Sequence, residues 1–228
     1  VGLIKNNNDI FVIEQVGYIR ELSNHNILHN LQDRVASPID NWEHGLLGYE
    51  YNKEKEYFIF SYIPKIKNDK YFLKISKSND YVNKDTNLED LFEFKRKDRF
   101  HHGGRLQYYK NDLYLGIGDG EDKTISDNWE NPNGSILKLY LEKKSFEILS
   151  KGLRNPWGWG FDKDNDNLWV GDVGDNDWEE LNLIENGRNY GYPSWEGPLC
   201  IRKYNFFCQK KEFKEPHLAH NHKGDEKI

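Results

Sequence analysis

Short apolar segments separated by glycine- and aspartate-containing turns follow one another along most of this chain, with a loose repeat of about 45 residues. Their length and spacing are typical of antiparallel strands joined by tight turns. The 228-residue chain also contains 14% aromatic residues and no methionine, and alanine is scarce. This composition favours pleated sheet over helix. The sequence therefore predicts an all-β protein in which helix is a minor component.

Four repeats can be followed along the chain. Their segments include DIFVIEQ with GYIREL, then HGLLGYEYN to KYFLKIS, then RLQYY to SFEILS, and finally GWGFD to EELNLIE with a last turn at NGRNYG. Several antiparallel strands per repeat are typical of β-propeller blades. A β-sandwich with long loops is the alternative, but the repeated order of apolar strand, Gly-Asp and polar loop favours the propeller.

The charge-dense segment 84–99 is predicted to be an outer edge strand and loop with a solvated face.

Charge and hydropathy restrict the class of partner. The net charge is −6 with both signs interspersed, which argues against a nucleic-acid groove or an anionic membrane surface. No apolar run approaches the roughly 20 residues that span a bilayer, and the first residues, Val1 to Ile4, do not resemble a secretory leader. A small molecule is the predicted partner.

Because the chain begins without methionine, we expect a processed chain or a fragment of a longer protein.

Two adjacent histidines, His101 and His102, precede a pair of glycines. In an extended segment neighbouring side chains point to opposite faces, so the two cannot chelate one metal. We expect His101 to face a pocket as a general base and His102 to point away from it, with Asp119 within hydrogen-bonding reach of His101. A histidine with only a structural hydrogen bond is the alternative for His101.

Arg154 lies in the string GLRNP, where Pro156 restricts the preceding residue to extended geometry. A guanidinium fixed there could polarise a substrate oxygen or hold an anionic cofactor. A salt bridge between blades is the alternative. We expect Arg154 to face the same cavity as His101 and Asp119.

Two acidic segments and a histidine cluster are candidate metal sites. The run Asp162, Asp164, Asp166 lacks the glycine and glutamate of an EF-hand loop and is predicted to be an Asx-rich hairpin turn. The segment GDVGDNDWEE instead offers the carbonyl oxygens of Gly174 and Asp175 and the carboxylate of Glu180. Ligation by oxygen alone favours calcium over zinc. The C-terminal residues His217, His220 and His222 are predicted to lie in a flexible tail rather than in a transition-metal site.

Two cysteines, Cys200 and Cys208, are the whole thiol content of the chain. If oxidised, they would close a short loop worth about 2–3 kcal/mol and would indicate an oxidising compartment. Two unpaired thiols in a cytosolic protein are the alternative.

Several strings together resemble a known family. They are EHGLLGYEYN, HHGGRL, LYLGIGDG, GLRNPWGWGFD, LWVGDVGDNDWEELNLI and GRNYGYPSWEG, and they cover most of residues 10–197 in the family's order. With them the chain resembles the soluble quinoprotein glucose dehydrogenases and aldose sugar dehydrogenases, also called glucose/sorbosone dehydrogenases. The string CIRKYNFFC also resembles a secreted bacterial branch in which a cysteine pair follows the EG turn. This likeness implies a Cys200–Cys208 disulfide and a periplasmic or secreted protein.

The resemblance implies a six-bladed propeller that carries pyrroloquinoline quinone (PQQ) and calcium at its central mouth. His101 would be the general base, Asp119 would orient it, and Arg154 would contact the quinone. Backbone carbonyls of Gly174 and Asp175 would bind the calcium ion that polarises PQQ. The family often has proline at the second of these positions, which a carbonyl ligand tolerates.

Further family positions are matched by Glu180 and Tyr190, which would form a second, structural calcium site, and by Glu43, which would face the substrate.

The chain departs from the family at its end, because the last recognisable motif lies near residue 197. The following blades, which supply a lysine and arginines for the PQQ carboxylates, are absent. We therefore expect residues 1–228 to form one partial propeller domain of about four blades. A degenerate product that does not hold PQQ is the alternative, but we favour a fragment of a longer protein that is inactive on its own.

The function implied is a PQQ-dependent oxidoreductase acting on CH–OH groups of aldose sugars or related alcohols and aldehydes, with a sugar and an electron acceptor as partners. Homodimerisation of the full-length protein is left open. The alternative is a non-catalytic propeller that binds a glycan or protein, as propeller relatives of hedgehog-binding proteins do. The joint presence of His101, Asp119 and Arg154 favours the enzyme. A calcium-dependent lactonase propeller would need carboxylates and Asn around a central metal, which these motifs fit poorly.

Overall fold

The computed structural model describes residues 2–6, 9–79, 88–124, 128–201, 213–223 and 226–227. All regular secondary structure in this part of the chain is β-strand, and no helix long and apolar enough to cross a membrane is found there. The strands of the first half are β1 Gly2–Asn6, β2 Asp9–Glu14, β3 Tyr18–Glu21, β4 Ile27–Asn30, β5 Leu46–Asn52, β6 Tyr57–Tyr62, β7 Tyr71–Ser78, β8 Glu89–Arg96, β9 Gly103–Tyr109 and β10 Asp112–Ile117. Those of the second half are β11 Ser135–Tyr140, β12 Ser145–Lys151, β13 Pro156–Phe161, β14 Leu168–Asp172, β15 Trp178–Ile184, β16 Arg188–Asn189, β17 Trp195–Glu196, β18 Leu199–Cys200, β19 Leu218–Asn221 and β20 Glu226–Lys227.

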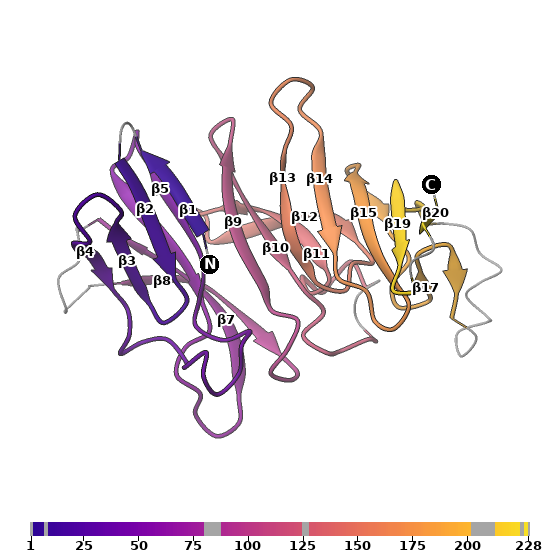
Figure 1. Ribbon diagram of the computed structural model, residues 1–228, viewed down its shortest axis with the longest axis horizontal. Helices are drawn as coiled ribbons and strands as arrows, with labels where there is room; N and C mark the ends of the chain where they lie inside the picture. Colours follow the sequence, from indigo (N-terminus) through magenta and orange to yellow (C-terminus); the bar gives the residue numbers. More distant parts are fainter. Residues whose placement is uncertain are drawn as a thin grey trace. The chain divides into compact units, whose positions relative to one another are not determined.

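The strands form four larger sheets, each built mainly from strands that are consecutive in the sequence (Figure 1). Their orders are β1-β2-β3-β4, β5-β6-β7-β8, β16-β12-β11-β10-β9 and β13-β14-β15-β19-β20, and β17 pairs with β18 in a separate ribbon. Four up-and-down antiparallel strands per sheet are the arrangement of a propeller blade. The predicted all-β class and the predicted number of about four blades are both confirmed.

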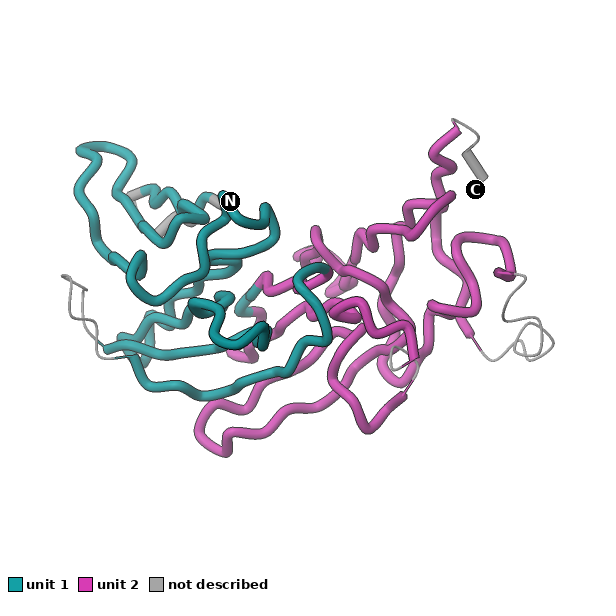
Figure 2. Tube along the Cα trace, turned by 90° about the horizontal axis from the view of Figure 1, so that it is seen from below, with its two compact units in different colours: residues 1–100, 106–108 teal, residues 101–105, 109–228 magenta. Residues whose placement is uncertain are grey.

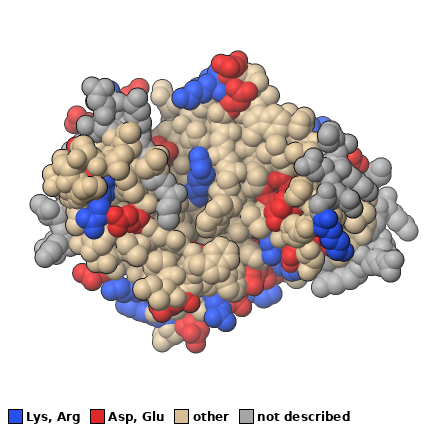
Figure 3. Space-filling model, viewed as in Figure 1, with Lys and Arg blue, Asp and Glu red and all other residues tan. Residues whose placement is uncertain are grey.

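The chain divides into two compact units (Figure 2). Unit 1 comprises residues 1–100 and 106–108, and unit 2 comprises residues 101–105 and 109–228. On the face seen in Figure 3, basic and acidic residues lie next to one another in several places, and the described residues show no continuous patch of one sign. The surface seen there agrees with the interspersed charges of the sequence.

Unit 1 has a core in which apolar side chains of the first two sheets pack together. The buried members are Ile13, Ile19, Leu31, Val35, Leu46, Tyr49, Phe58, Phe60 and Tyr62.

Strand β8 lies at the edge of its sheet, and exposed and buried residues alternate along much of it. The predicted edge strand within residues 84–99 is therefore found at 89–96, while residues 84–87 lie outside the described part.

Unit 2 has its own core, made of Ile136, Leu153, Trp159, Leu168, Val170 and Tyr190. The turn between β9 and β10 consists of Lys110 and Asn111, whose φ angles are 47° and 67°. Two successive positive φ values are what a type I′ turn requires, and its twist matches that of the flanking strands. Local turn chemistry thus fixes this hairpin, which lies between the two segments that carry His101 and Asp119.

The turn predicted at NGRNYG is found at Asn186 and Gly187. Strand β16 within it pairs in parallel with β12 of the third sheet, and Ser150 stands opposite Arg188. The outer positions of the fourth sheet are taken by β19 and β20. The turn residues thus predicted where the chain reverses, whereas they do not indicate which strand it joins afterwards.

One buried histidine gives unit 1 a pH dependence. His29 is fully buried, its ring centroid lies 4.4 Å from that of Phe58, and its Nε2 lies 3.3 Å from the Tyr49 hydroxyl. Burial lowers the pKa of His29 from 6.5 to about 3. The native protein therefore keeps this ring neutral at a pH where the unfolded chain would protonate it.

We expect the free energy of unfolding to be largest above pH 6.5 and to fall as the pH is lowered toward 3, because the unfolded chain then binds a proton that native His29 does not. One proton corresponds to about 1.4 kcal/mol per pH unit. Urea denaturation at several pH values between these limits measures the slope. His29→Phe should reduce it by that amount, whereas His25→Asn, at an exposed position, should not. Equal slopes for all three proteins would contradict the assignment.

Candidate active site

His101 and Asp119 form a hydrogen-bonded pair in unit 2. The His101 Nδ1 atom lies 2.7 Å from Asp119 Oδ1, and the two side chains are 12% and 0% exposed. Because a carboxylate only accepts hydrogen bonds, the Nδ1–H donates and the Nε2 lone pair faces away from the carboxylate. The approach predicted from the sequence is found. The pair has the arrangement of a base whose tautomer is fixed by an acid.

Close backbone packing holds this pair in place. The N–H groups of Gly118 and Gly120 donate to the carbonyls of His102 and His101, at 3.4 and 3.2 Å. A Cβ on Gly118 would overlap the carbonyl oxygen of His101, so only glycine fits there without moving the histidine. His102 itself is fully buried. Gly118 and Gly120 of the GIGDG string therefore position the base rather than merely forming a turn.

Arg154 is anchored through its backbone. The N–H groups of Arg154 and Asn155 donate to the two carboxylate oxygens of Asp172, at 2.8 and 2.6 Å, and the carbonyl of Arg154 accepts from the N–H of Asp119 at 2.7 Å. Burial raises the pKa of Asp172 well above its usual range, and the Glu180 carboxylate adds to the effect. The sequence analysis missed Asp172, although an aspartate at the end of an apolar strand is a signal that could have found it.

The Arg154 side chain meets Asp175. Its Nη1 donates to the carbonyl of Val173 at 3.1 Å, and its Nη2 lies 3.4 Å from Asp175 Oδ1. The other oxygen of Asp175 forms an ion pair with Lys123, a residue that the sequence analysis did not single out. Burial acts to raise the pKa of Asp175, but Lys123, Arg154 and His101 outweigh it and hold the pKa below its usual value. His101, Arg154 and Asp175 therefore belong to one electrostatic cluster.

The loop that carries Gly174 and Asp175 is organised by Glu196, which is 5% exposed. Glu196 Oε1 accepts hydrogen bonds from four successive N–H groups, those of Asp175 at 2.9 Å, Asn176 at 2.7 Å, Asp177 at 2.8 Å and Trp178 at 3.1 Å. A Cβ on Gly174 would overlap the Trp178 carbonyl. No hydrogen bond to the carbonyl oxygens of Gly174 or Asp175 occurs among the described residues. Both oxygens therefore fit the role of calcium ligands that the resemblance gave them.

Three buried polar atoms of this cluster make no hydrogen bond in the part of the chain that the structure describes. They are Asp119 Oδ2, Arg154 Nε and the hydroxyl of Tyr192. One is an acceptor, one a donor, and the hydroxyl can be either. Buried polar groups in native proteins are nearly always satisfied, so a group of such atoms indicates a bound molecule. Arg154 Nε and the Tyr192 hydroxyl can donate to the oxygens of an anionic ligand such as PQQ, whereas Asp119 Oδ2 requires a hydrogen-bond donor.

The second calcium site was assigned to Glu180 and Tyr190, whose side chains are engaged with different partners. Glu180 accepts from Gly197 N at 2.7 Å and Asn182 Nδ2 at 3.0 Å, and the Tyr190 hydroxyl bonds to Leu183 O at 2.6 Å and Glu185 N at 2.8 Å. Burial raises the pKa of Glu180 to about 7. No group of three or more His, Cys, Asp or Glu side chains suited to a metal occurs among the described residues. This site stays a prediction.

The acidic run at 162–166 forms the turn between β13 and β14, as predicted. The N–H of Asp164 donates to Asp162 Oδ1 at 2.9 Å, which is an Asx turn. The Asp166 carboxylate bonds to Tyr109 and Lys110. These carboxylates therefore serve the turn and its neighbours.

The C-terminal histidines do not lie in a flexible tail, and that prediction was wrong. His220 belongs to β19, which pairs with β15 opposite Glu179. His222 follows it, with Nε2 2.8 Å from Glu179 Oε1 and Nδ1 3.1 Å from the carbonyl of Asn176. Pairing with the exposed edge of β15 orders this segment, and the polar composition gave no sign of it.

Two further predictions concern other parts of the chain. Glu43 is 2% exposed and lies in unit 1, in a turn where its N–H donates to Asn41 Oδ1 at 2.9 Å. Its role toward a substrate stays a prediction.

Cys208, the expected partner of Cys200, lies outside the described residues, so the disulfide also stays a prediction.

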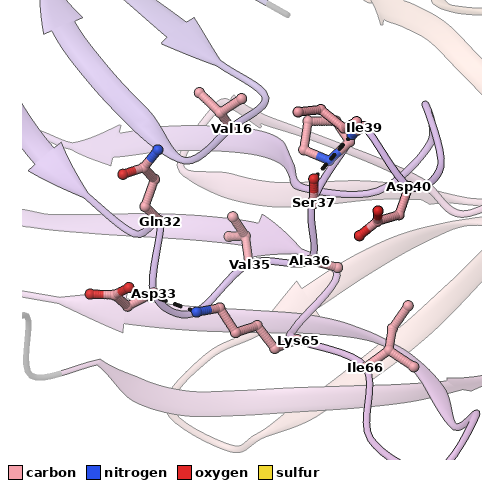
Figure 4. A pocket seen from close by; sticks show the side chains of 11 residues that line it. Val16, Gln32, Asp33, Val35, Ala36, Ser37, Ile39, Asp40, Lys65 and Ile66 are labelled. Carbon is pink, nitrogen blue, oxygen red and sulfur yellow. Dashed lines mark hydrogen bonds and ion pairs between the residues drawn. The ribbon is translucent and has the colours of Figure 1, made fainter.

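Unit 1 contains a pocket of about 560 Å³. Figure 4 shows its lining, which comes from Val16, residues 32–33 and 35–40, Lys65 and Ile66. Its ion pair joins Lys65 Nζ to Asp33 Oδ1 at 3.7 Å, and the Asp33 side chain is fully exposed. None of the site residues predicted from the sequence lines it. A pocket whose charges face solvent gives little basis for catalysis.

Comparison with known proteins gives consistent matches. A family model described as Glucose / Sorbosone dehydrogenase matches residues 3–222. The aldose sugar dehydrogenase YliI of Escherichia coli (strain K12) is 26% identical over 107 residues, which are 41% of this chain and 29% of that protein. The HIPL2 protein of Arabidopsis thaliana is 27% identical over 160 residues, 53% of this chain and 23% of that protein. The matched region thus spans less than a third of either relative.

Solved structures share the fold. The PQQ-bound form of the aldose sugar dehydrogenase from Streptomyces coelicolor superposes with a TM-score of 0.72 at 19% identity, covering 96% of this chain and 67% of that chain. The apo form of the soluble aldose sugar dehydrogenase from Escherichia coli gives 0.73 at 19% identity, with 94% and 70% covered. The described sheets are therefore the part of this propeller fold that the present chain contains.

Proposed function

This chain belongs to the glucose/sorbosone dehydrogenase family, and on that premise we propose that it is part of a PQQ-dependent oxidoreductase acting on CH–OH groups of aldose sugars or related alcohols and aldehydes. The observation that carries the proposal is the His101–Asp119 hydrogen bond in the same electrostatic cluster as the nearly buried Arg154. A protein that only binds a ligand needs no base oriented by a carboxylate.

The chain's own residues have separate tasks in this proposal. His101 Nε2 accepts the proton of the substrate hydroxyl, and the Asp119 carboxylate stabilises the imidazolium that forms. Arg154, held by Val173 and Asp175, presents a fixed positive charge to the anionic cofactor. PQQ, when bound, supplies the two-electron acceptor that the oxidation requires. The carbonyls of Gly174 and Asp175 would hold the calcium ion beside it.

The proposal includes a cellular setting. The Cys200–Cys208 disulfide predicted from the sequence would suit a periplasmic or secreted enzyme. A sugar and an external electron acceptor would then be its small-molecule partners.

We expect the intact protein that contains this chain to bind PQQ in the presence of calcium and to reduce a dye when an aldose is added. Quenching of tryptophan fluorescence measures PQQ binding, and dye bleaching measures turnover over a panel of sugars. Samples without PQQ or without calcium are the controls. Absence of PQQ binding would remove the basis of this proposal.

The alternative function is a non-catalytic propeller that binds a glycan or a protein. It is supported by the matches to the HIPL1 and HIPL2 proteins of Arabidopsis thaliana, whose names state no activity. A protein of this kind would bind no PQQ and reduce no dye. The same experiment therefore separates the two functions.

A further inference from the structure

Tyr192 is brought to the Arg154 segment by backbone pairing. The N–H groups of Tyr190 and Tyr192 donate to the carbonyls of Lys151 and Gly152, at 2.8 and 3.0 Å. Gly152 has a φ of 72°, and a Cβ there would lie only 2.6 Å from the N–H nitrogen of residue 191. The two backbones therefore run in contact, and Arg154 follows two residues after this contact.

The Tyr192 side chain is buried among the charged groups of the candidate active site. Its exposed fraction is 5%. Burial raises the pKa of its hydroxyl strongly, the carboxylates of Asp119 and Asp175 raise it further, and the Arg154 guanidinium opposes them. The hydroxyl therefore lies within electrostatic reach of all three.

The Arg154 guanidinium acts on that hydroxyl as a hydrogen-bond donor, but the hydroxyl itself donates to no acceptor among the described residues. Arg154 Nε and Asp119 Oδ2 are buried without partners in the same way. A buried donor that is left unpaired costs stability, and a ligand that pairs with it recovers that cost on binding. One buried polar atom without a hydrogen bond can result from local packing. Three such atoms in one charged cluster indicate a ligand bound among them.

We propose that Tyr192 is a further ligand-contacting residue of this site, and that its hydroxyl donates a hydrogen bond to an oxygen of bound PQQ beside the one held by Arg154. The inference rests on the proposed function, because it takes PQQ to be the occupant. A phenol suits this position because it donates a hydrogen bond without adding a charge beside Asp119 and Asp175. No pattern in the sequence distinguishes it from the other 13 of the 14 tyrosines.

The test is Tyr192→Phe in the intact protein that contains this chain, with PQQ itself as the probe. We expect the dissociation constant for PQQ, measured by fluorescence titration, to increase by about tenfold, as for loss of one hydrogen bond to a charged group. Without PQQ the melting temperature should stay the same or rise, because the hydroxyl removed donates no hydrogen bond among the described residues. Tyr140→Phe is the matched control, since the Tyr140 hydroxyl donates to Glu147 at 2.8 Å on the exposed surface. It should leave PQQ binding unchanged.

The outcomes are distinguishable. If the unchanged protein binds PQQ and Tyr192→Phe binds it equally well, this inference is overturned while the proposed function stands. If Tyr192→Phe unfolds or melts at a clearly lower temperature without PQQ, the hydroxyl has a structural partner and the inference is also overturned. If the unchanged protein binds no PQQ, both the proposed function and the inference fail.

Discussion

Replacing His101 by alanine should lower the turnover of the PQQ-loaded protein by about 100-fold or more, the usual loss when a general base is removed. The imidazole is the group in the cluster that can accept the substrate proton, at its Nε2, because its Nδ1 is bonded to Asp119. Dye reduction under saturating sugar measures turnover. The affinity for PQQ should change by less than about twofold, since a base that acts on the substrate contributes little to cofactor binding.

The His101 experiment has two controls. Adding imidazole to the His101→Ala variant should restore part of the turnover, because the space left by the side chain can accept the free base. His25→Asn replaces an exposed histidine of unit 1 and should leave turnover unchanged. An alanine variant that turns over at the rate of the unchanged protein would place the base elsewhere.

Replacing Arg154 by alanine should weaken PQQ binding by about 10- to 100-fold and should also lower turnover. A guanidinium that contacts the anionic cofactor acts both in the resting complex and during the reaction, so both quantities depend on it. Its 12% exposed side chain places the charge in a poorly solvated position, where salt screens it less than on the surface. Fluorescence titration with PQQ at low and high salt measures the loss.

Two further variants test whether the loss of PQQ affinity depends on the position and the donor geometry of the Arg154 side chain. Arg154→Lys keeps the charge but loses the fork of donors, so it should recover only part of the affinity. Arg188→Ala removes a positive charge from an exposed position paired with Glu185 at 3.5 Å, and it should leave the affinity for PQQ unchanged. Equal affinities for Arg154→Ala and Arg188→Ala would show that Arg154 does not hold the cofactor.

Local patterns were enough to predict the sheets and part of the site. Each of the four larger sheets is built mainly from strands that follow one another, so alternation and turn chemistry along a short stretch specify most of the pairing. His101 and Asp119 are separated by 18 residues on either side of one hairpin. Their approach is a consequence of that hairpin, and the sequence therefore predicted it.

Sequence alone thus determined the all-β class, the consecutive strands that make up most of each sheet and the His101–Asp119 pair. Only the tertiary structure decided what surrounds that pair. Lys123 and Asp175 are 52 residues apart, and the Glu196 carboxylate reaches a loop 18 to 21 residues away. The phenol of Tyr192 comes to the cluster because β16 leaves its own repeat and pairs with β12. Periodicity specifies which face of a strand is buried, but contacts between separate loops depend on how the sheets and their connections pack, which no local pattern contains.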